Sequence, residues 1–540
     1  MQLSKLTLAI TAAIGVSLSS QAFAINLYMD VKTKQIYAEP GPRRELLGSF
    51  SKDGDVHARK ANPESPATAP ENTEIAAIRE DLELKTNEIK ALEEHAKEAS
   101  EFKVKLDDGI EFKSADGNFK AAINGRMQVD SQTNVVNEVN PAAVNTAVCT
   151  PPGCPTNNEL GDGAGIRRAR LGVEGTFFKD FDYKFEYDFT RGNGTIGAGV
   201  TDAYMRWNLN KPFSVKVGAF KEPFSLEEAT SNRYISFIER NMVVNAFVDN
   251  LNTYKVGVGA NYAADRWNLS TSFQTEPVGA NPSGSSSSAS SINTNGGSNR
   301  NNGSGDTGWE VNGRLAGTPW MESKTKFLHV GASGSYINVN NNYQPNGDFN
   351  NGGFSFTSAT GANVDRTNEL NTGQLTSGKL GAAGSRQLNH WTRFGAETAL
   401  VYGPFSAQAE YIQADLYGTG YNGESMKGYY GYMSYFLTGE SRAYKTKTAA
   451  WDRLKPNHNF DMKGGWGAWE VVAGYDYLDM TDGVIKGGRA DVARFGINWY
   501  PNSHVRVMTN LVHALNLNTA QRGFNNADLD MFETRVQLDW

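Results

Sequence analysis

From about Lys120 to the last residue, hydrophobic and polar side chains alternate along the chain with a period of two. The clearest examples are YKFEYDFT at 183–190 and FETRVQLDW at 532–540. Successive side chains of a β-strand point to opposite faces, so this alternation predicts strands with one apolar and one polar face. Similar runs begin near Ala121, Ile166, Thr201, Phe213, Thr253, Trp267, Trp309, Lys326, Thr392, Phe405, Tyr429, Ala468, Val492 and Val505. We expect about sixteen strands, an even number typical of closed transmembrane barrels.

The connections between these strands alternate in length. Short links lie at 179–181, 210–211, 263–265, 403–404 and 501–502, and long polar ones lie between them, including 281–306 and 338–389. Short turns at one end and long loops at the other are typical of an up-and-down membrane barrel, whereas a soluble β-sandwich has no reason to keep that order. The stretch 438–465 is long where the count predicts a short turn.

The connection after the strand at Phe213 is unusual. The strand stops at Pro223, because proline cannot donate to a strand ladder, and the next alternating run begins near Asn252. Between them lie charges of both signs and the apolar residues Phe224, Ile235, Phe237 and Ile238. A long loop with that much apolar material usually packs on something, and such loops tend to be functional. We predict that it folds inward and narrows a pore; the alternative is an ordinary surface loop.

The N-terminus predicts export. Lys5 precedes an apolar run that ends in Ala22-Phe23-Ala24, which is the pattern of a signal peptide over 1–24. Residues 25–70 are read as a small periplasmic β-like segment followed by the Pro/Ala linker NPESPATAP.

Residues 71–103 are expected to form a coiled-coil helix, followed by the barrel over 104–540. Apolar residues there recur at alternating intervals of three and four positions, which is a heptad repeat, and most residues between them are Glu or Lys. The core positions are Ile75, Ile78, Leu82, Lys85, Ile89, Leu92, Ala96 and Ala99. Isoleucine at both core positions of the first heptad favours three strands over two. The alternative is a lone amphipathic helix.

Composition excludes some functions and leaves others open. The net charge of -7 gives no nucleic-acid signature. The mean hydropathy of -0.49 is compatible with a soluble protein or with a membrane barrel, in which only alternate residues meet lipid. The only cysteines, Cys149 and Cys154, predict a small disulfide loop in an exported chain; a metal site would need further ligands nearby. The 7 histidines are scattered, so we predict neither an enzyme nor a cofactor.

Several blocks of the chain resemble the phosphate-selective porins O and P. These blocks are IRRARLGVEGTFFKDFDYKFEYDF, VGAFKEPFSLEEATSN, YFLTGESRAYK, GGWGAWEVVAGYDYLDM and FGINWYPNSHVRVMTNLVHAL. The resemblance covers roughly residues 104–540. It implies an outer-membrane barrel of sixteen strands, usually trimeric, whose third loop folds inside to form the constriction. A coiled coil would fit the axis of such a trimer on the periplasmic side.

A channel that passes anions needs cationic side chains that point inward at its narrowest part. Alternation predicts which side chains face the lumen: Arg126, Arg168, Arg170, Asp202, Arg206, Lys216 and Arg314. For each of them the alternative is a solvated charge paired with a nearby acid, such as Glu174 or Asp130.

The resemblance also implies a set of constriction residues in the third loop. Arg233 and Arg240 stand where family members have basic residues, and Asp202 resembles an acidic residue of the family's anion site. The chain departs from the family pattern at Glu227 and Glu228, close to Lys221. A carboxylate facing the path of a dianion repels it by about 1 kcal/mol or more. The fifth loop has only Arg366, Lys379 and Arg386 where family members have a run of arginines.

The leading hypothesis is a trimeric porin of the bacterial outer membrane, in contact with lipid, through which small hydrophilic solutes, chiefly anions, diffuse passively. An alternative is a structural protein whose coiled coil (71–100) contacts the cell wall while the barrel serves as an anchor. A third option is an exported, soluble β-rich binding protein.

Overall fold

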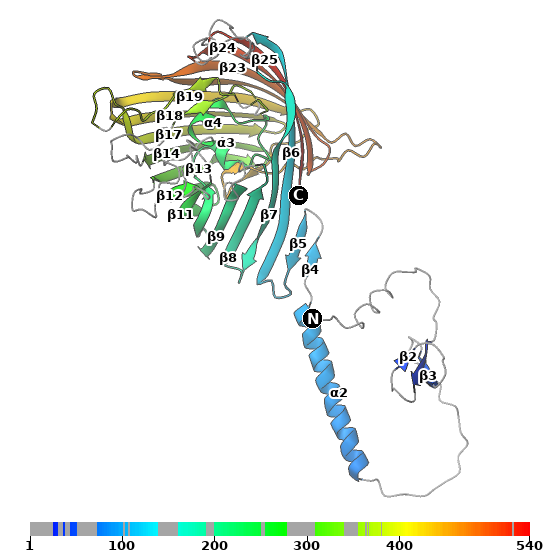
Figure 1. Ribbon diagram of the computed structural model, residues 1–540. Helices are drawn as coiled ribbons and strands as arrows, with labels where there is room; N and C mark the ends of the chain where they lie inside the picture. Colours follow the sequence, from blue (N-terminus) through cyan, green and yellow to red (C-terminus); the bar gives the residue numbers. More distant parts are fainter. Residues whose placement is uncertain are drawn as a thin grey trace, which may run out of the picture. The chain divides into compact units, whose positions relative to one another are not determined.

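Figure 1 shows the computed structural model of the chain. It describes residues 25–30, 36–37, 44–50, 73–100, 103–105, 109–138, 160–190, 199–249, 254–277, 308–339, 355–361, 364–365, 367–379, 381–520 and 523–540. The predicted signal peptide, Cys149, Cys154 and Arg366 lie outside the described residues.

The main part of the molecule is a closed ring of antiparallel strands (Figure 1). The last strand, β25 (Asp528–Asp539), pairs with β6 (Phe119–Glu138), so sixteen strands close the ring. The others are β7 (Gly163–Phe177), β8 (Phe181–Asp188), β9 (Val200–Asn210), β10 (Phe213–Lys221), β11 (Tyr254–Ala263), β12 (Trp267–Pro277), β13 (Trp309–Ser323), β14 (Lys326–Asn338), β17 (Gln387–Tyr402), β18 (Phe405–Thr419), β19 (Tyr421–Phe436), β22 (Ala468–Asp482), β23 (Ile485–Tyr500) and β24 (Val505–Asn518). This confirms the predicted antiparallel barrel, and each alternating run corresponds to one strand.

The C-terminal residue helps to close the ring. Trp540 exchanges two backbone hydrogen bonds with Gly125 of β6, each with an N–O distance of 3.1 Å. The indole of Trp540 lies over Gly125, where an added Cβ would be only 2.3 Å from a ring carbon. Any larger residue at position 125 would therefore push the C-terminus away. A short hairpin of β4 (Lys103–Lys105) and β5 (Ile110–Lys113) continues the same edge of β6.

Side-chain burial alternates along the strands. On β7, Arg168 and Arg170 are buried, whereas Leu171 and Val173 are exposed. The ring therefore has an apolar outer face and an inner face rich in polar and charged side chains. The outer face suits contact with lipid, and enclosed charges are tolerated where they pair with one another.

The lengths of the connections do not alternate strictly between short and long; there are three exceptions. Short turns join β7 to β8, β9 to β10, β11 to β12, β13 to β14, β17 to β18 and β23 to β24 at one end of the ring, the turn end. At the opposite loop end, however, β18 and β19 are joined by Gly420 alone, and β22 and β23 by residues 483–484. Gly420 has a φ of 77°, which glycine adopts without strain. At the turn end, 437–467 is long and contains a hairpin of β20 (Tyr444–Lys445) and β21 (Ala450–Trp451).

Towards the loop end of β18, the polarity of the two faces is reversed: apolar side chains point inward and polar ones point outward. Ile412, Ala414 and Leu416 on its inner side are fully buried, whereas Gln413 and Asp415 on its outer side are only half-buried. The inner residues belong to a large apolar cluster that includes Met242 and Phe247 of the third loop and Phe356 and Leu370 of the fifth. The fifth loop contributes β15 (Thr357–Ser358) and β16 (Leu370–Asn371), which pair with each other. Polar-inside patterning therefore ends where loops pack against the strands.

The described residues of 1–90 and those of 91–540 belong to two separate units. In the first, β1 (Ile25–Asp30), β2 (Ile36–Tyr37) and β3 (Arg44–Phe50) make a three-stranded sheet. The helix α2 (Thr73–Ser100) covers the predicted heptads. No helix in the described part of the chain is both long and apolar enough to span a bilayer.

Candidate functional site

The third connection at the loop end, loop 3 (described over residues 222–249), is hydrogen-bonded to side chains of the barrel strands. It contains the short helices α3 (Leu226–Ala229) and α4 (Met242–Phe247), both largely buried. Backbone carbonyls that are buried need donors. Inner-face arginines supply them: Arg393 donates to Phe247, Arg494 to Arg240, Arg506 to Ile235 and Arg535 to Ile238.

Carboxylates of the inner face hold the amide groups of loop 3 in the same way. Glu410 of β18 accepts hydrogen bonds from the backbone N–H groups of Leu226 and Glu227, at 3.1 and 2.8 Å. Asp476 of β22 accepts from the N–H of Met242 at 3.1 Å. These are the free N–H groups at the starts of α3 and α4, where a negative charge is favourable.

The predicted lumen residues Arg126 and Arg170 meet at one carboxylate. Glu186 of β8 lies 2.6 Å from Arg126 and 2.9 Å from Arg170, and Arg233 of loop 3 lies 3.9 Å away. Arg170 also pairs with Asp188 at 2.8 Å. Arg126 in addition donates to the side chain of Asn232 in loop 3. Three arginines thus share Glu186 where β6, β7 and β8 face loop 3.

A second group forms around Glu239 of loop 3. Arg167 binds it at 2.7 Å, Arg535 at 2.9 Å and Arg168 at 4.0 Å. Burial alone would raise the pKa of Glu239, but these three arginines hold that pKa below its ordinary value. Arg535 also makes two hydrogen bonds of 2.7 Å to Asp130.

Simple alternation would place Arg167 outside, next to Arg168. The pairing of β6 with β7 shifts register at this point, with Gln128 opposite Arg168 and Val129 opposite Ile166. Arg167 is therefore the extra residue of a β-bulge, which turns its side chain to the same face as that of Arg168.

The start of loop 3 is anchored by a buried ion-pair network that the sequence analysis did not identify. Glu222 lies 2.7 Å from both Lys255 of β11 and Arg393 of β17. Lys255 also pairs with Glu310 of β13 at 2.7 Å, and the guanidinium of Arg393 lies 4.1 Å from the centre of the Phe224 ring. Every member is buried, so removal of one charge would leave its partners uncompensated.

The loop residues predicted for the constriction occupy different positions. Glu227, Glu228 and Arg240 are 1%, 0% and 3% exposed. Arg240 Nε lies 2.9 Å from Glu228 Oε2, and Lys221 Nζ lies 2.5 Å from Glu228 Oε1. Burial raises the pKa of both glutamates, and Arg240 opposes that rise. Glu228 therefore pairs with Arg240 of the same loop and with Lys221 at the end of β10, and Glu227 accepts a hydrogen bond from Gln408 of β18. The side chain of Arg233 is 12% exposed.

The long turn-end connection, the 437–467 segment, also contacts loop 3. Trp451 is 3% exposed; its indole N–H donates to Gln408 of β18 at 2.6 Å, and its backbone N–H to Thr230 at 3.3 Å. Arg442 lies 3.8 Å from the centre of the Trp451 ring, and Gln408 in turn donates to Glu227 at 3.0 Å. The sequence analysis noted only that this connection is longer than a turn. That length is the feature of the sequence that could have indicated a packed segment.

The remaining predicted lumen residues lie nearer the turn end. Asp202 pairs with Lys184 at 2.8 Å, and Arg206 with Asp182 at 2.5 Å. Arg314 is buried against Glu397 at 2.6 Å and donates to the carbonyl of Ala449 at 2.7 Å. Lys216 faces the rings of Tyr204 and Phe220. The alternative for each of these charges was a nearby acid partner such as Glu174 or Asp130. Arg206 and Arg314 have the acid partners Asp182 and Glu397, whereas Lys216 contacts no carboxylate among the described residues.

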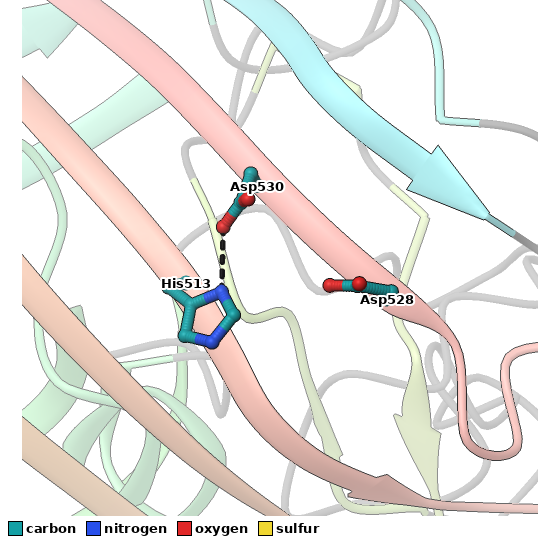
Figure 2. A group of neighbouring side chains, drawn as sticks. All are labelled: His513, Asp528 and Asp530. Carbon is teal, nitrogen blue, oxygen red and sulfur yellow. Dashed lines mark hydrogen bonds and ion pairs between the residues drawn. The ribbon is translucent and has the colours of Figure 1, made fainter.

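Figure 2 shows a group of possible metal ligands in the described part of the chain. His513 of β24 and Asp528 and Asp530 of β25 place ligand atoms within 4.8 Å of one another on the outer side of the ring. His513 Nδ1 lies 2.6 Å from Asp530 Oδ1, and both side chains are well exposed. An ordinary surface ion pair accounts for this contact.

Known proteins share the barrel portion of this chain. Residues 154–540 match the family model described as phosphate-selective porin O and P. Porin O of Pseudomonas aeruginosa is 28% identical over 451 residues, which cover 80% of this chain and 91% of that porin. An uncharacterized protein of Caulobacter vibrioides is 26% identical over 434 residues, covering 80% of this chain and 76% of that protein. Among solved structures, in-vitro folded OmpT, an outer membrane protein of Vibrio cholerae, aligns with a TM-score of 0.43 at 10% identity and covers 78% of this chain and 98% of that one. Since the family match spans more than half of the chain, this protein belongs to the phosphate-selective porin O and P family and is a multi-pass porin of the bacterial outer membrane.

Proposed function

We propose that this porin forms a water-filled channel that favours small anions and that loop 3 folds into the bore as its constriction. The observation that carries the proposal is an excess of arginine where β6–β8 and β25 meet loop 3. Six arginines, Arg126, Arg167, Arg168, Arg170, Arg233 and Arg535, share four carboxylates, Asp130, Glu186, Asp188 and Glu239. Uncompensated positive charge at a narrow point draws anions in and excludes cations.

The contacts of loop 3 support its place in the bore. Its backbone bonds to inner-face side chains of β17, β18, β22, β23, β24 and β25, which together form a long arc of the ring. Its helix α4 shares one apolar cluster with inner residues of β18 and β19. A loop lying outside the ring could not reach these side chains.

Recordings on the purified protein in planar bilayers test this proposal. With a salt gradient across the bilayer, we expect stable steps of conductance and a reversal potential of the sign set by anions. A channel that prefers cations, or a purified barrel with no conductance, would overturn it.

We propose that loop 3 does not favour phosphate over other small anions. The family resemblance implies a lysine in phosphate-specific members where this loop has Glu227 and Glu228, and the charge of Glu228 is taken up by Lys221 and Arg240. This loop therefore lacks the positive charge that such a lysine would contribute to the binding of a dianion such as phosphate. Added phosphate should reduce chloride current no more than an equal concentration of another small anion does.

We further propose that the mature chain begins at Ile25 and assembles as a homotrimer through the helix of 71–103. In the single chain, Leu82, Ile89 and Leu92 of α2 are exposed at heptad spacing. Such a stripe on an isolated helix is expected to pack against copies of itself. Chemical cross-linking of the intact protein should yield a trimer that is weakened in a variant with Leu82, Ile89 and Leu92 changed to serine.

A second candidate function is a tether between the outer membrane and the cell wall. The same exposed stripe of α2 and the linker before it favour this alternative. Deletion of residues 25–100 separates the two. A porin keeps its conductance without them, whereas a tether loses attachment of the envelope and shows membrane blebbing.

A further inference from the structure

The 437–467 segment has a second ordered part besides its hairpin. Residues 459–465 form a compact turn, the tip turn. Oδ1 of Asp461 accepts hydrogen bonds from two backbone N–H groups further along this turn, at 2.7 and 2.9 Å. The backbone N–H of Phe460 donates to the carbonyl of Pro501, in the short turn between β23 and β24, at 2.7 Å. These bonds give the side chains of the tip turn a fixed position.

Met462 of the tip turn has an unusual backbone and an unusual exposure. Its φ of 57° lies in the left-handed region, which glycine, asparagine and aspartate adopt more readily than methionine. Met462 is also 87% exposed, more than any other large hydrophobic residue in the described part of the chain. A small polar residue would suit both this backbone and water. A methionine that suits neither indicates a partner outside the chain that is not water.

Trp466 extends the apolar surface of the tip turn. It is 70% exposed, and its carbonyl accepts hydrogen bonds from the indole N–H groups of Trp469 and Trp499, at 3.1 and 2.9 Å. Those two rings stack with their centres 5.6 Å apart, and the ring of Phe460 packs edge-on against Trp499 at 5.2 Å. Met462 and Trp466 are therefore displayed beside a rigid aromatic base.

This aromatic base continues the outer face of the ring. Glu470 and Asn498, the chain neighbours of Trp469 and Trp499, are buried on the inner side, where they hydrogen-bond to each other at 2.9 Å. Because successive side chains of a strand point to opposite faces, Trp469 and Trp499 face outward. In an outer-membrane barrel that face meets lipid, and tryptophan is enriched where the bilayer meets water. The partner that fits the exposed side chains is therefore a lipid surface.

The charge of the tip turn favours one class of lipid. Lys463 follows Met462, is exposed and makes no ion pair among the described residues. The carboxylate of Asp461 is already engaged by backbone N–H groups of the turn. A lysine beside inserted apolar side chains can keep its ammonium group at the level of the headgroups. An anionic headgroup supplies the partner that this ammonium group lacks.

We propose that the tip turn and Trp466 form a lipid-binding finger. Met462 and Trp466 insert into the headgroup layer of the leaflet at the turn end, and Lys463 binds the headgroup of an anionic phospholipid. The finger attaches the 437–467 segment to the membrane outside the ring, whereas Trp451 attaches the same segment to the strands inside. This inference does not depend on which ions the channel prefers.

Quenching of a fluorescent label by brominated lipids tests the insertion. The label is attached to M462C in the full chain, with C149S and C154S to remove the native thiols, in bilayers whose acyl chains carry bromine close to the headgroup. The matched control is K324C, at an exposed position in the short turn between β13 and β14. Quenching at 462 should exceed that at 324 about twofold or more, since an interfacial segment lies about 5–10 Å deep. W466A should reduce the quenching at 462 while conductance stays that of the wild type.

The headgroup preference is tested with the same label. In mixed bilayers, brominated phosphatidylglycerol among plain phosphatidylcholine should quench it more than brominated phosphatidylcholine among plain phosphatidylglycerol, and K463Q should remove the difference. Equal quenching by the two lipids without K463Q would overturn the role of Lys463. Equal quenching at 462 and 324 would overturn the finger itself, as would a label at 462 that is shielded from lipid and lies against the label of a second copy. A conducting, anion-selective channel in those cases would leave the proposed function standing.

Discussion

Glu228 and Arg240 form a buried ion pair inside loop 3. Their side chains are 0% and 2% exposed, and Oε2 of Glu228 lies 2.9 Å from Nε of Arg240. The guanidinium also donates to the carbonyls of Glu227 and Thr230. The pair therefore joins helix α3 to the segment just before α4, so it contributes to the shape of loop 3 more than to its net charge.

Replacement of Arg240 by glutamine should destabilise loop 3. Removing one partner of a buried pair costs about 3–5 kcal/mol, because the other charge stays buried without compensation. We expect a lower unfolding temperature in detergent together with larger and noisier single-channel conductance. The E228Q/R240Q double variant should recover part of the stability. Equal unfolding temperatures for wild type and R240Q would show that the pair does not hold the loop.

Arg233 should behave differently from Arg240. Its side chain is 12% exposed, lies 3.9 Å from Glu186 and donates to the carbonyl of Gly125 at 3.4 Å. R233E should shift the reversal potential in a salt gradient towards cations while the unfolding temperature changes little. K326E is the matched control, since Lys326 is an exposed lysine beside Glu322 at the turn end. A selectivity shift of equal size in both variants would contradict a role for Arg233 in the path.

The ring itself could be predicted from the sequence, because a period of two is a local signal that each strand displays on its own. Arg168, Arg170 and Arg206 were placed on the inner side by that rule. Arg167 was not, because the bulge that turns it inward appears only in the pairing of β6 with β7.

Pairing within the site could not be predicted, because it depends on which strands and loops meet. Nothing local to Glu222 indicates Lys255 or Arg393 as its partners. The inner apolar residues Ile412 and Leu416 could have indicated that a loop packs against β18, since apolar side chains that face a water-filled channel are normally covered by other residues.

Trp451 should control how firmly the 437–467 segment is held. Changing a buried tryptophan to alanine typically costs about 3–5 kcal/mol. W451A would also remove a donor to Gln408 and the ring beneath Arg442. We expect higher conductance and faster proteolysis within 437–467. Trp466, which is 70% exposed, provides the control, and W466A should match the wild type in both assays. Unchanged conductance in W451A would mean that this segment does not obstruct the bore.

The packing of the fifth loop should depend on pH through Glu369. This side chain is 2% exposed, and its carboxylate accepts a hydrogen bond from the N–H of Thr360 at 3.0 Å. Burial raises the pKa of Glu369 from 4.5 to about 7, and Asp365 adds to the rise. The folded loop therefore holds a proton that the unfolded loop releases near pH 4.5. The stability that this proton confers is complete below pH 4.5 and is lost as the pH rises through 7; over that range it amounts to about 3 kcal/mol.

Hydrogen exchange measures this effect directly. Amides of 355–361 and 367–379 should exchange faster at pH 8 than at pH 6, after correction for the intrinsic effect of pH on exchange. E369Q keeps an acceptor for Thr360 but cannot ionise, so its corrected exchange should not change between the two values. Thr519, which donates to the carbonyl of Glu369 at 2.6 Å, should gain mobility with the loop in the wild type. Equal protection at both pH values in the wild type would show that Glu369 ionises without loosening the loop.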